Sequence, residues 1–118
     1  MQHTGQIKRA LGISGIHTEE HSWRRRGKDG VRGAQIDLLI KRADRAVNIC
    51  EMKYSDGEYE LKADECVNLK HRREAYIEDE KFKGSVFLTL VTPHGALHNA
   101  HWNDIQSEVT LDDLFAAK

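Results

Sequence analysis

The amino-acid sequence predicts an α+β domain with a central mixed sheet flanked by helices, tending toward a three-layer α/β/α sandwich. Two apolar runs at 35–41 and 47–54, separated by a short polar connection, predict a β-hairpin. A charged segment at 60–80 carries apolar residues at helical spacing, and the apolar, β-branched run at 85–92 predicts a buried strand. The expected order is helix, three strands, helix, strand, and then a small strand and helix.

The N-terminal segment predicts a short helix followed by extended chain. Residues 2–11 carry apolar side chains at helical spacing, and Gly12 marks the expected end of that helix. We expect 13–16 and 21–26 to be extended, with Gly15 at a bulge or bend.

Short polar segments frame the predicted hairpin. A Gly-Lys-Asp-Gly sequence at 27–30 predicts a turn before it. The connection between its strands is the tight segment 43–45, and 55–57 closes the second strand.

The segment 60–80 predicts an amphipathic helix with one buried stripe, ended by Gly84. Pro93 ends the strand expected at 85–92. The residues of the buried stripe are Leu61, Cys66, Leu69, Tyr76 and Ile77.

The C-terminal part gives weaker signals. Residues 94–103 show no clear pattern, and 104–109 indicate a last strand. Thr110 is expected to cap a final helix, with Asp113 placed to reach back to it.

Composition limits the class of protein. The 118 residues suit one domain, and 31% of them are charged. Eighteen basic residues face 19 acidic ones, for a net charge of −1, which excludes a uniformly basic protein. No apolar run approaches membrane-spanning length, and the first residues carry no signal-peptide pattern. Because Cys50 and Cys66 lack CxxC spacing, we expect reduced thiols in a cytoplasmic protein.

Three charged residues lie within the apolar strands of the hairpin: Asp37, Glu51 and Lys53. Side chains alternate along a strand, so Glu51 and Lys53 share a face, with Met52 opposite. A three-residue connection would set Asp37 across from Glu51 and bring the three together. The apolar residues expected on the other face are Ile36, Leu38, Cys50 and Met52.

Charge in the middle of apolar strands requires compensation. One reading is a buried carboxylate–lysine pair, or an edge hairpin with one solvated face. The other is a hard-cation site, because two neighbouring carboxylates repel and a divalent ion relieves the repulsion. A lysine beside them could orient a water nucleophile or stabilise a pentavalent phosphorane, as metal-assisted phosphodiester hydrolysis requires.

Asp37, a hairpin and then Glu51-Met52-Lys53 resemble the PD-(D/E)XK nuclease superfamily, and the order of elements resembles its restriction-endonuclease-like core. The sequence is more closely similar to the C-terminal nuclease-like domain of bacterial AAA-type ATPases. The segments that carry this resemblance extend over essentially the whole chain and are His3, 6–8, 10–13, Ser22-Trp23, 35–38, 50–53, Leu88-Thr89, Gly95 and 109–115.

The resemblance implies a Mg²⁺- or Mn²⁺-dependent DNase-like domain over 1–118, as part of a larger ATPase or working with an ATPase subunit. It implies that Asp37 and Glu51 bind the metal, with the Met52 carbonyl as a further ligand, and that Lys53 is the catalytic lysine. Gln35, two residues before Asp37, would support the site. The alternative is an inactive nuclease-fold domain that binds DNA, or docks or oligomerises the ATPase.

Two features depart from these relatives. The relatives carry an N-terminal ATP-binding domain, whereas nothing in these 118 residues resembles a phosphate-binding Gly-rich loop with its lysine. Residues 1–11 also lack the acidic residue that the superfamily often places on its first helix.

Basic residues form two groups that would contact DNA phosphates in a nuclease. The densest basic run consists of Arg24, Arg25, Arg26, Lys28 and Arg32. Lys70 and Arg72 lie on the long predicted helix. The alternative for each group is a solvated loop or helix face.

The histidines and tryptophans have simpler interpretations. The spacing of His94, His98 and His101 resembles zinc ligands, but no further ligand completes a set, so we expect surface histidines. Trp23 and Trp102 are expected at the core or its edge.

Overall fold

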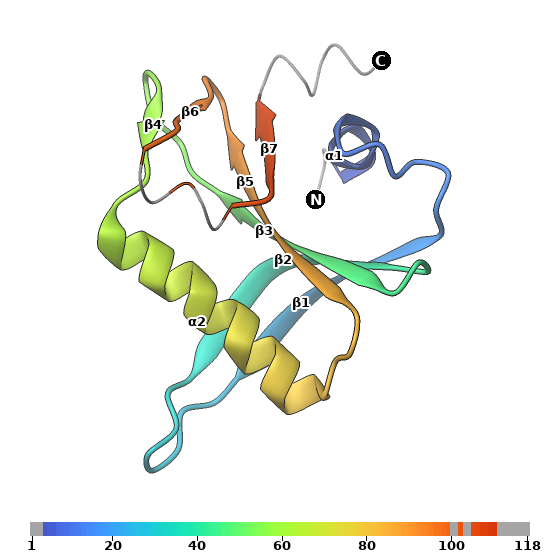
Figure 1. Ribbon diagram of the computed structural model, residues 1–118, viewed down its shortest axis with the longest axis vertical. Coiled ribbons are helices and arrows are strands. Elements are labelled where there is room, and N and C mark those ends of the chain that lie inside the picture. Colours follow the sequence, from blue (N-terminus) through green and yellow to red (C-terminus); the bar gives the residue numbers. More distant parts are fainter. Residues whose placement is uncertain (1–3, 100–101, 103–104, 111–118) are drawn as a thin grey trace.

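The computed structural model describes residues 4–99, 102 and 105–110, and the side chains from Ile7 onward. The protein is an α+β domain with a mixed central sheet, as the sequence predicts (Figure 1). The strands of the main sheet lie in the order β1-β2-β3-β5-β7, and a small second sheet pairs β4 with β6. The elements are α1 (Thr4–Ala10), β1 (Thr18–Arg25), β2 (Ala34–Arg42), β3 (Ala46–Met52), β4 (Tyr59–Glu60), α2 (Ala63–Glu80), β5 (Ser85–Thr92), β6 (Ala96–Leu97) and β7 (Ser107–Thr110).

The sheet has an antiparallel half and a parallel half. Strands β1, β2 and β3 pair antiparallel through short connections. The chain then passes through α2 before β5 pairs parallel to β3, and β7 pairs parallel to β5. A parallel pair requires such a crossover, which a helix commonly provides.

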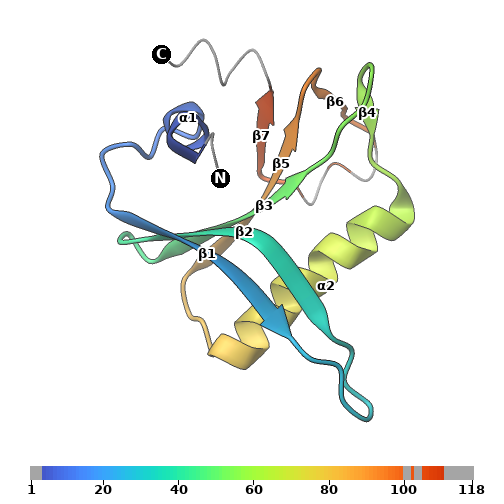
Figure 2. The ribbon, with the colours of Figure 1, turned by 180° about the vertical axis from the view of Figure 1, so that it is seen from behind.

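The two helices pack on opposite faces of the main sheet, as the two views in Figures 1 and 2 show. On one face, α2 buries Cys66, Leu69 and Tyr76 against strand residues such as Ile49 and Leu88. Trp23 packs against this cluster, its ring edge-on to Tyr76 at 5.5 Å, which confirms its expected place at the core edge. On the other face, Ile7 of α1 packs with the cluster Ile13, Leu38, Ile40, Cys50, Val91 and Val109.

The end of α1 agrees with the sequence, whereas the next segment does not. Gly12 has a φ of 75°, the left-handed conformation that glycine favours after a helix. The Ile13 N–H donates to the Lys8 carbonyl and the Ile16 N–H to the Ile13 carbonyl. The extended structure expected at 13–16 is therefore wrong, because these bonds close turns.

The other helix and strands are of the types that the sequence predicts, apart from two short strands. Strand β5 covers the expected residues, and α2 begins three residues later than expected. The two-residue strands β4 and β6 had no expected counterpart. Strand β7 includes Thr110, and the helix expected after that residue lies outside the described part of the chain. Among the described residues, no helix is long and apolar enough to cross a membrane.

Candidate functional site

The hairpin of β2 and β3 has the register that the sequence predicts. Leu38 pairs with Cys50 and Arg42 with Ala46, across a three-residue connection. Arg45 adopts a left-handed φ of 63° in this connection. The described ladder ends at Leu38, so it does not include the expected pair of Asp37 and Glu51.

A β-bulge interrupts β2 at the position of the predicted aspartate. His21 pairs with Leu39, and Trp23 pairs with Ile36, so Asp37 and Leu38 together oppose one residue of β1. Ile36 packs in the α2-side core, whereas Leu38 packs in the α1-side core. The expectation that Ile36 and Leu38 share a face is wrong, because the bulge breaks the alternation between them.

Asp37 is exposed, and its Oδ1 accepts a hydrogen bond from Gln35 Nε2 at 3.0 Å. Gln35 thus touches the predicted metal ligand that it was expected to support. No described contact joins Asp37 to Glu51 or Lys53, so the role of Asp37 stays a prediction.

Glu51 and Lys53 lie together on the α2 side of the sheet, as alternation predicts. Lys53 Nζ is 3.5 Å from Glu51 Oε1. Met52 between them packs against the α1-side cluster instead. The Lys53 N–H continues the pairing of β3 with β5 by donating to the Val91 carbonyl at 3.0 Å. This hydrogen bond fixes the backbone of Lys53.

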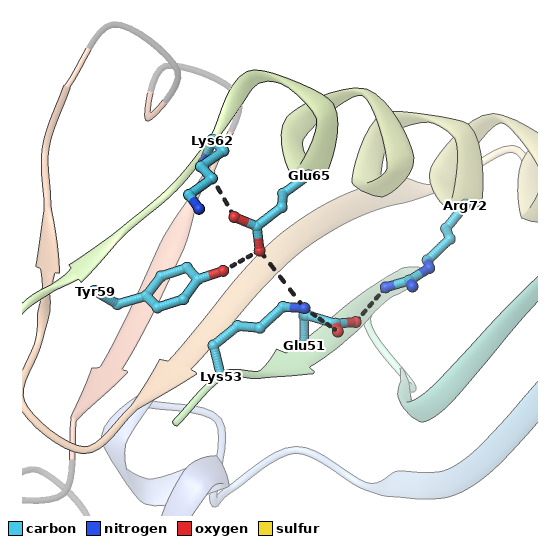
Figure 3. Close-up of polar contacts among 6 residues, drawn as sticks. All are labelled: Glu51, Lys53, Tyr59, Lys62, Glu65 and Arg72. Carbon is cyan, nitrogen blue, oxygen red and sulfur yellow. Dashed lines mark hydrogen bonds and ion pairs between the residues drawn. The ribbon is translucent and has the colours of Figure 1, made fainter. Parts of the chain in front are cut away.

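Arg72 of α2 reaches the same carboxylate. Its Nη1 donates to Glu51 Oε2, and the two side chains are 29% and 17% exposed. Arg72 was expected to contact DNA; in this structure it forms an ion pair with the predicted metal ligand (Figure 3). Both oxygens of Glu51 therefore contact a positive group.

Glu65 is a member of the site that the sequence analysis missed. Its Oε2 lies 3.6 Å from Lys53 Nζ and accepts a hydrogen bond from the Tyr59 hydroxyl. Its Oε1 accepts the Lys62 N–H at 3.2 Å, so Glu65 also caps the N-terminus of α2. The contacts run without a break from Lys62 to Arg72 (Figure 3). Burial, and then the carboxylate of Glu65, raise the pKa of Tyr59.

A small pocket of about 40 Å³ lies between β3 and α2 at this network. Its charged lining residues are two carboxylates and two cations, so the site as described is balanced in charge. There is room for only a few water-sized groups. The lining residues are Glu51, Lys53, Glu65, Asn68, Leu69 and Arg72.

Two further pockets follow in sequence, each sharing lining residues with the one before it. A pocket of about 210 Å³ shares Asn68 and Arg72 with the first and is also lined by Arg32 and His71. An open pocket of about 510 Å³ shares the segment 33–35 with the second and is lined by the arginines at 24–26. We call these three pockets together the basic groove, because six of their lining side chains are Lys or Arg and two are Glu.

The arginines of the predicted basic run differ in their surroundings. Arg25 points to α2, where Nη1 lies 3.3 Å from Asp79 and 3.6 Å from Glu78, and its side chain is 11% exposed. Arg24 and Arg26 are exposed. Lys70 is partly buried on α2 and is not among the lining residues of these three pockets. Arg32, the last member of the same basic run, donates from Nη2 to Asn68 Oδ1 at 2.7 Å.

The site offers part of the donor chemistry that the Mg²⁺ or Mn²⁺ implied by the family resemblance would need. These ions prefer carboxylate and carbonyl oxygens, and Glu51 and Glu65 provide two carboxylates from neighbouring elements. Among the described residues, no group of three or more His, Cys, Asp or Glu converges as a ready ligand set. A divalent ion at Glu51 would also meet the positive charges of Lys53 and Arg72.

Comparison with known proteins supports the fold alone. No family model matches the sequence, and no curated protein matches it. One solved structure, described as a protein of unknown function, AF1548, is similar over 93% of this chain with a TM-score of 0.56 and 16% identity. The chain spans 58% of the length of that protein.

Proposed function

We propose that this chain is a divalent-cation-dependent nuclease domain that hydrolyses phosphodiester bonds in DNA. The observation that supports it most is the meeting of Glu51 and Lys53 under α2, at the inner end of a basic groove. A carboxylate, an ammonium and a path for a polyanion are three parts that such a reaction needs.

Each side chain has a distinct role in this proposal. Glu51 would hold the metal ion, with Asp37 and the Met52 carbonyl as the further ligands that the resemblance implies. The bound ion would polarise the phosphate and lower the pKa of an attacking water. Lys53, held between Glu51 and Glu65, donates a hydrogen bond to the attacking water or to a phosphate oxygen.

The groove supplies the binding of the substrate backbone. Arg24, Arg26 and Arg32 are its exposed guanidinium groups, and each is suited to a phosphate. Arg25 instead anchors β1 to α2 through Asp79. With a net charge of −1, the chain depends on this local patch for attraction to DNA.

The second candidate is an inactive nuclease-fold domain that binds DNA or docks to an ATPase. The full engagement of Glu51 by Lys53 and Arg72 favours it, because a carboxylate held by two cations needs no metal. The ATPase partner in either candidate rests on the sequence resemblance.

Nicking of supercoiled plasmid DNA in the presence of Mg²⁺ or Mn²⁺ tests the proposal. Wild-type protein should nick the plasmid, whereas Glu51→Gln and Lys53→Ala should not, and chelation should stop the reaction. Glu58→Gln removes an exposed carboxylate outside the network and serves as the matched control. DNA binding without nicking by the folded wild type, at several metal concentrations, would favour the second candidate.

A further inference from the structure

We infer that Arg72 is shared between two sites: it pairs with Glu51 while the groove is empty and with a DNA phosphate once the groove is occupied. Binding of the polyanion would thereby release Glu51 for a divalent cation. This inference rests on the proposed function and adds a coupling between its two ligands.

The first observation is the place of Arg72 between the pockets. Its side chain lines both the 40 Å³ pocket at Glu51 and the 210 Å³ pocket of the groove. It is 29% exposed, so the guanidinium is accessible from solvent while it donates to Glu51. A guanidinium carries five donors in a planar fork and matches a phosphate as well as a carboxylate.

The second observation is the composition of the groove pocket. Arg32 and His71 line it together with Arg72, and its described lining includes no acidic side chain. Arg32 is held by Asn68 Oδ1, and the ring of His71 lies 3.1 Å from the Gly33 carbonyl oxygen. Two positioned guanidinium groups beside an imidazole form a site for a tetrahedral anion such as a backbone phosphate.

The coupling follows from charge balance. With Arg72 on Glu51, the carboxylates of Glu51 and Glu65 are balanced by the cations of Lys53 and Arg72. If a phosphate attracts Arg72, the two carboxylates share one ammonium and the site gains affinity for a cation. The effect is reciprocal by linkage: a cation at Glu51 frees Arg72 and strengthens phosphate binding.

The test uses DNA binding without metal, so it does not depend on nuclease activity. Because Arg72 contacts a phosphate in the complexes of both proteins, Glu51→Gln should tighten the binding of a 20-base-pair duplex roughly fivefold, the scale of a partly exposed ion pair, with an unchanged salt slope. Arg72→Gln should lower the salt slope by about 0.9, the value of one phosphate contact. Glu65→Gln removes a carboxylate of similar burial that has no described contact with Arg72, so its affinity for the duplex should stay that of the wild type. The double variant Glu51→Gln/Arg72→Gln should lose the gain in affinity for the duplex that Glu51→Gln shows.

The outcomes separate this inference from the proposed function. Equal affinities of wild type and Glu51→Gln for the duplex, or an unchanged salt slope in Arg72→Gln, would overturn the inference and leave the proposed function standing. Failure of both proteins to bind the duplex would refute both. A similar gain in Glu65→Gln would assign the effect to general charge and overturn the role of Arg72.

A second measurement covers the case in which Glu51→Gln fails to fold. Calorimetric titration of Mn²⁺ alone into Arg72→Gln should give an affinity roughly fivefold above that of the wild type, the scale of a partly exposed ion pair. Equal affinities in the two proteins would overturn the inference.

Discussion

Replacing Glu65 by alanine should destabilise the protein, because this one carboxylate joins the start of α2, the β4 strand and the lysine of the site. It accepts the Lys62 N–H, accepts the Tyr59 hydroxyl and lies near Lys53. These contacts fix the position of Lys53, so Glu65 is a positioning residue for the proposed site.

The expected loss is about 2–3 kcal/mol in the free energy of unfolding. A helix cap contributes about 1 kcal/mol, and a hydrogen bond to a charged acceptor contributes about 1.5–3 kcal/mol. The contact with Lys53, one-third exposed, adds no more than ~1 kcal/mol. The terms overlap in one side chain, so the total is smaller than their sum. Glu65→Gln keeps an acceptor oxygen and should lose about 1 kcal/mol.

Urea unfolding at pH 7 measures these differences. Glu74→Ala is the matched control on the same helix, since Glu74 is exposed and paired only with the adjacent Arg73 among the described contacts. It should stay within ~0.5 kcal/mol of wild type. A double-mutant cycle of Glu65→Ala and Tyr59→Phe should give a coupling free energy near 1 kcal/mol between the two positions. A loss below ~0.5 kcal/mol for Glu65→Ala would refute the reasoning.

Three further predictions concern other parts of the chain. A Cβ at Gly84 would lie 2.0 Å from the Arg45 carbonyl oxygen, so Gly84→Ala should cost about 2–3 kcal/mol and lower the Tm by roughly 10 °C in calorimetry. Burial raises the pKa of the Cys50 thiol from 9.0 to about 12, so its stabilising effect is complete below pH 9 and is lost as the pH rises toward 12. Between pH 8 and pH 10.5 the wild type should therefore lose ~2 kcal/mol more than Cys50→Ala in urea unfolding, and equal losses would contradict the assignment. Arg24→Ala/Arg26→Ala should weaken DNA binding for all sequences alike and reduce the salt slope by roughly one per lost contact, whereas an unchanged slope would remove this loop from the interface.

The sequence predicted the parts of the fold that depend on local pattern. Alternation and a three-residue connection gave the register of β2 and β3 and the shared face of Glu51 and Lys53. The apolar spacing of 60–80 gave α2 and its buried residues Cys66, Leu69 and Tyr76. Side chains repeat every two residues along a strand and every 3.6 residues along a helix. The order of apolar and polar residues in the sequence therefore indicates these features.

The rest depended on contacts between distant segments. The bulge at Asp37 results from pairing with β1, and no residue type in β2 marks it. In the sequence, Glu65 cannot be distinguished from the other charged residues of the predicted helix. Its partners Lys53 and Tyr59 come from other elements. The two-residue strands β4 and β6 pair with each other across more than 30 residues and leave no periodic signal.

Anomalous diffraction from crystals soaked in millimolar Mn²⁺ tests the central claim most directly. The account predicts a manganese peak at the Glu51 carboxylate, with Asp37 as a second ligand and Arg72 turned away from Glu51. A fully soaked crystal with no peak at Glu51, and with Arg72 still bound to that carboxylate, would contradict the assignment of a metal-dependent nuclease site.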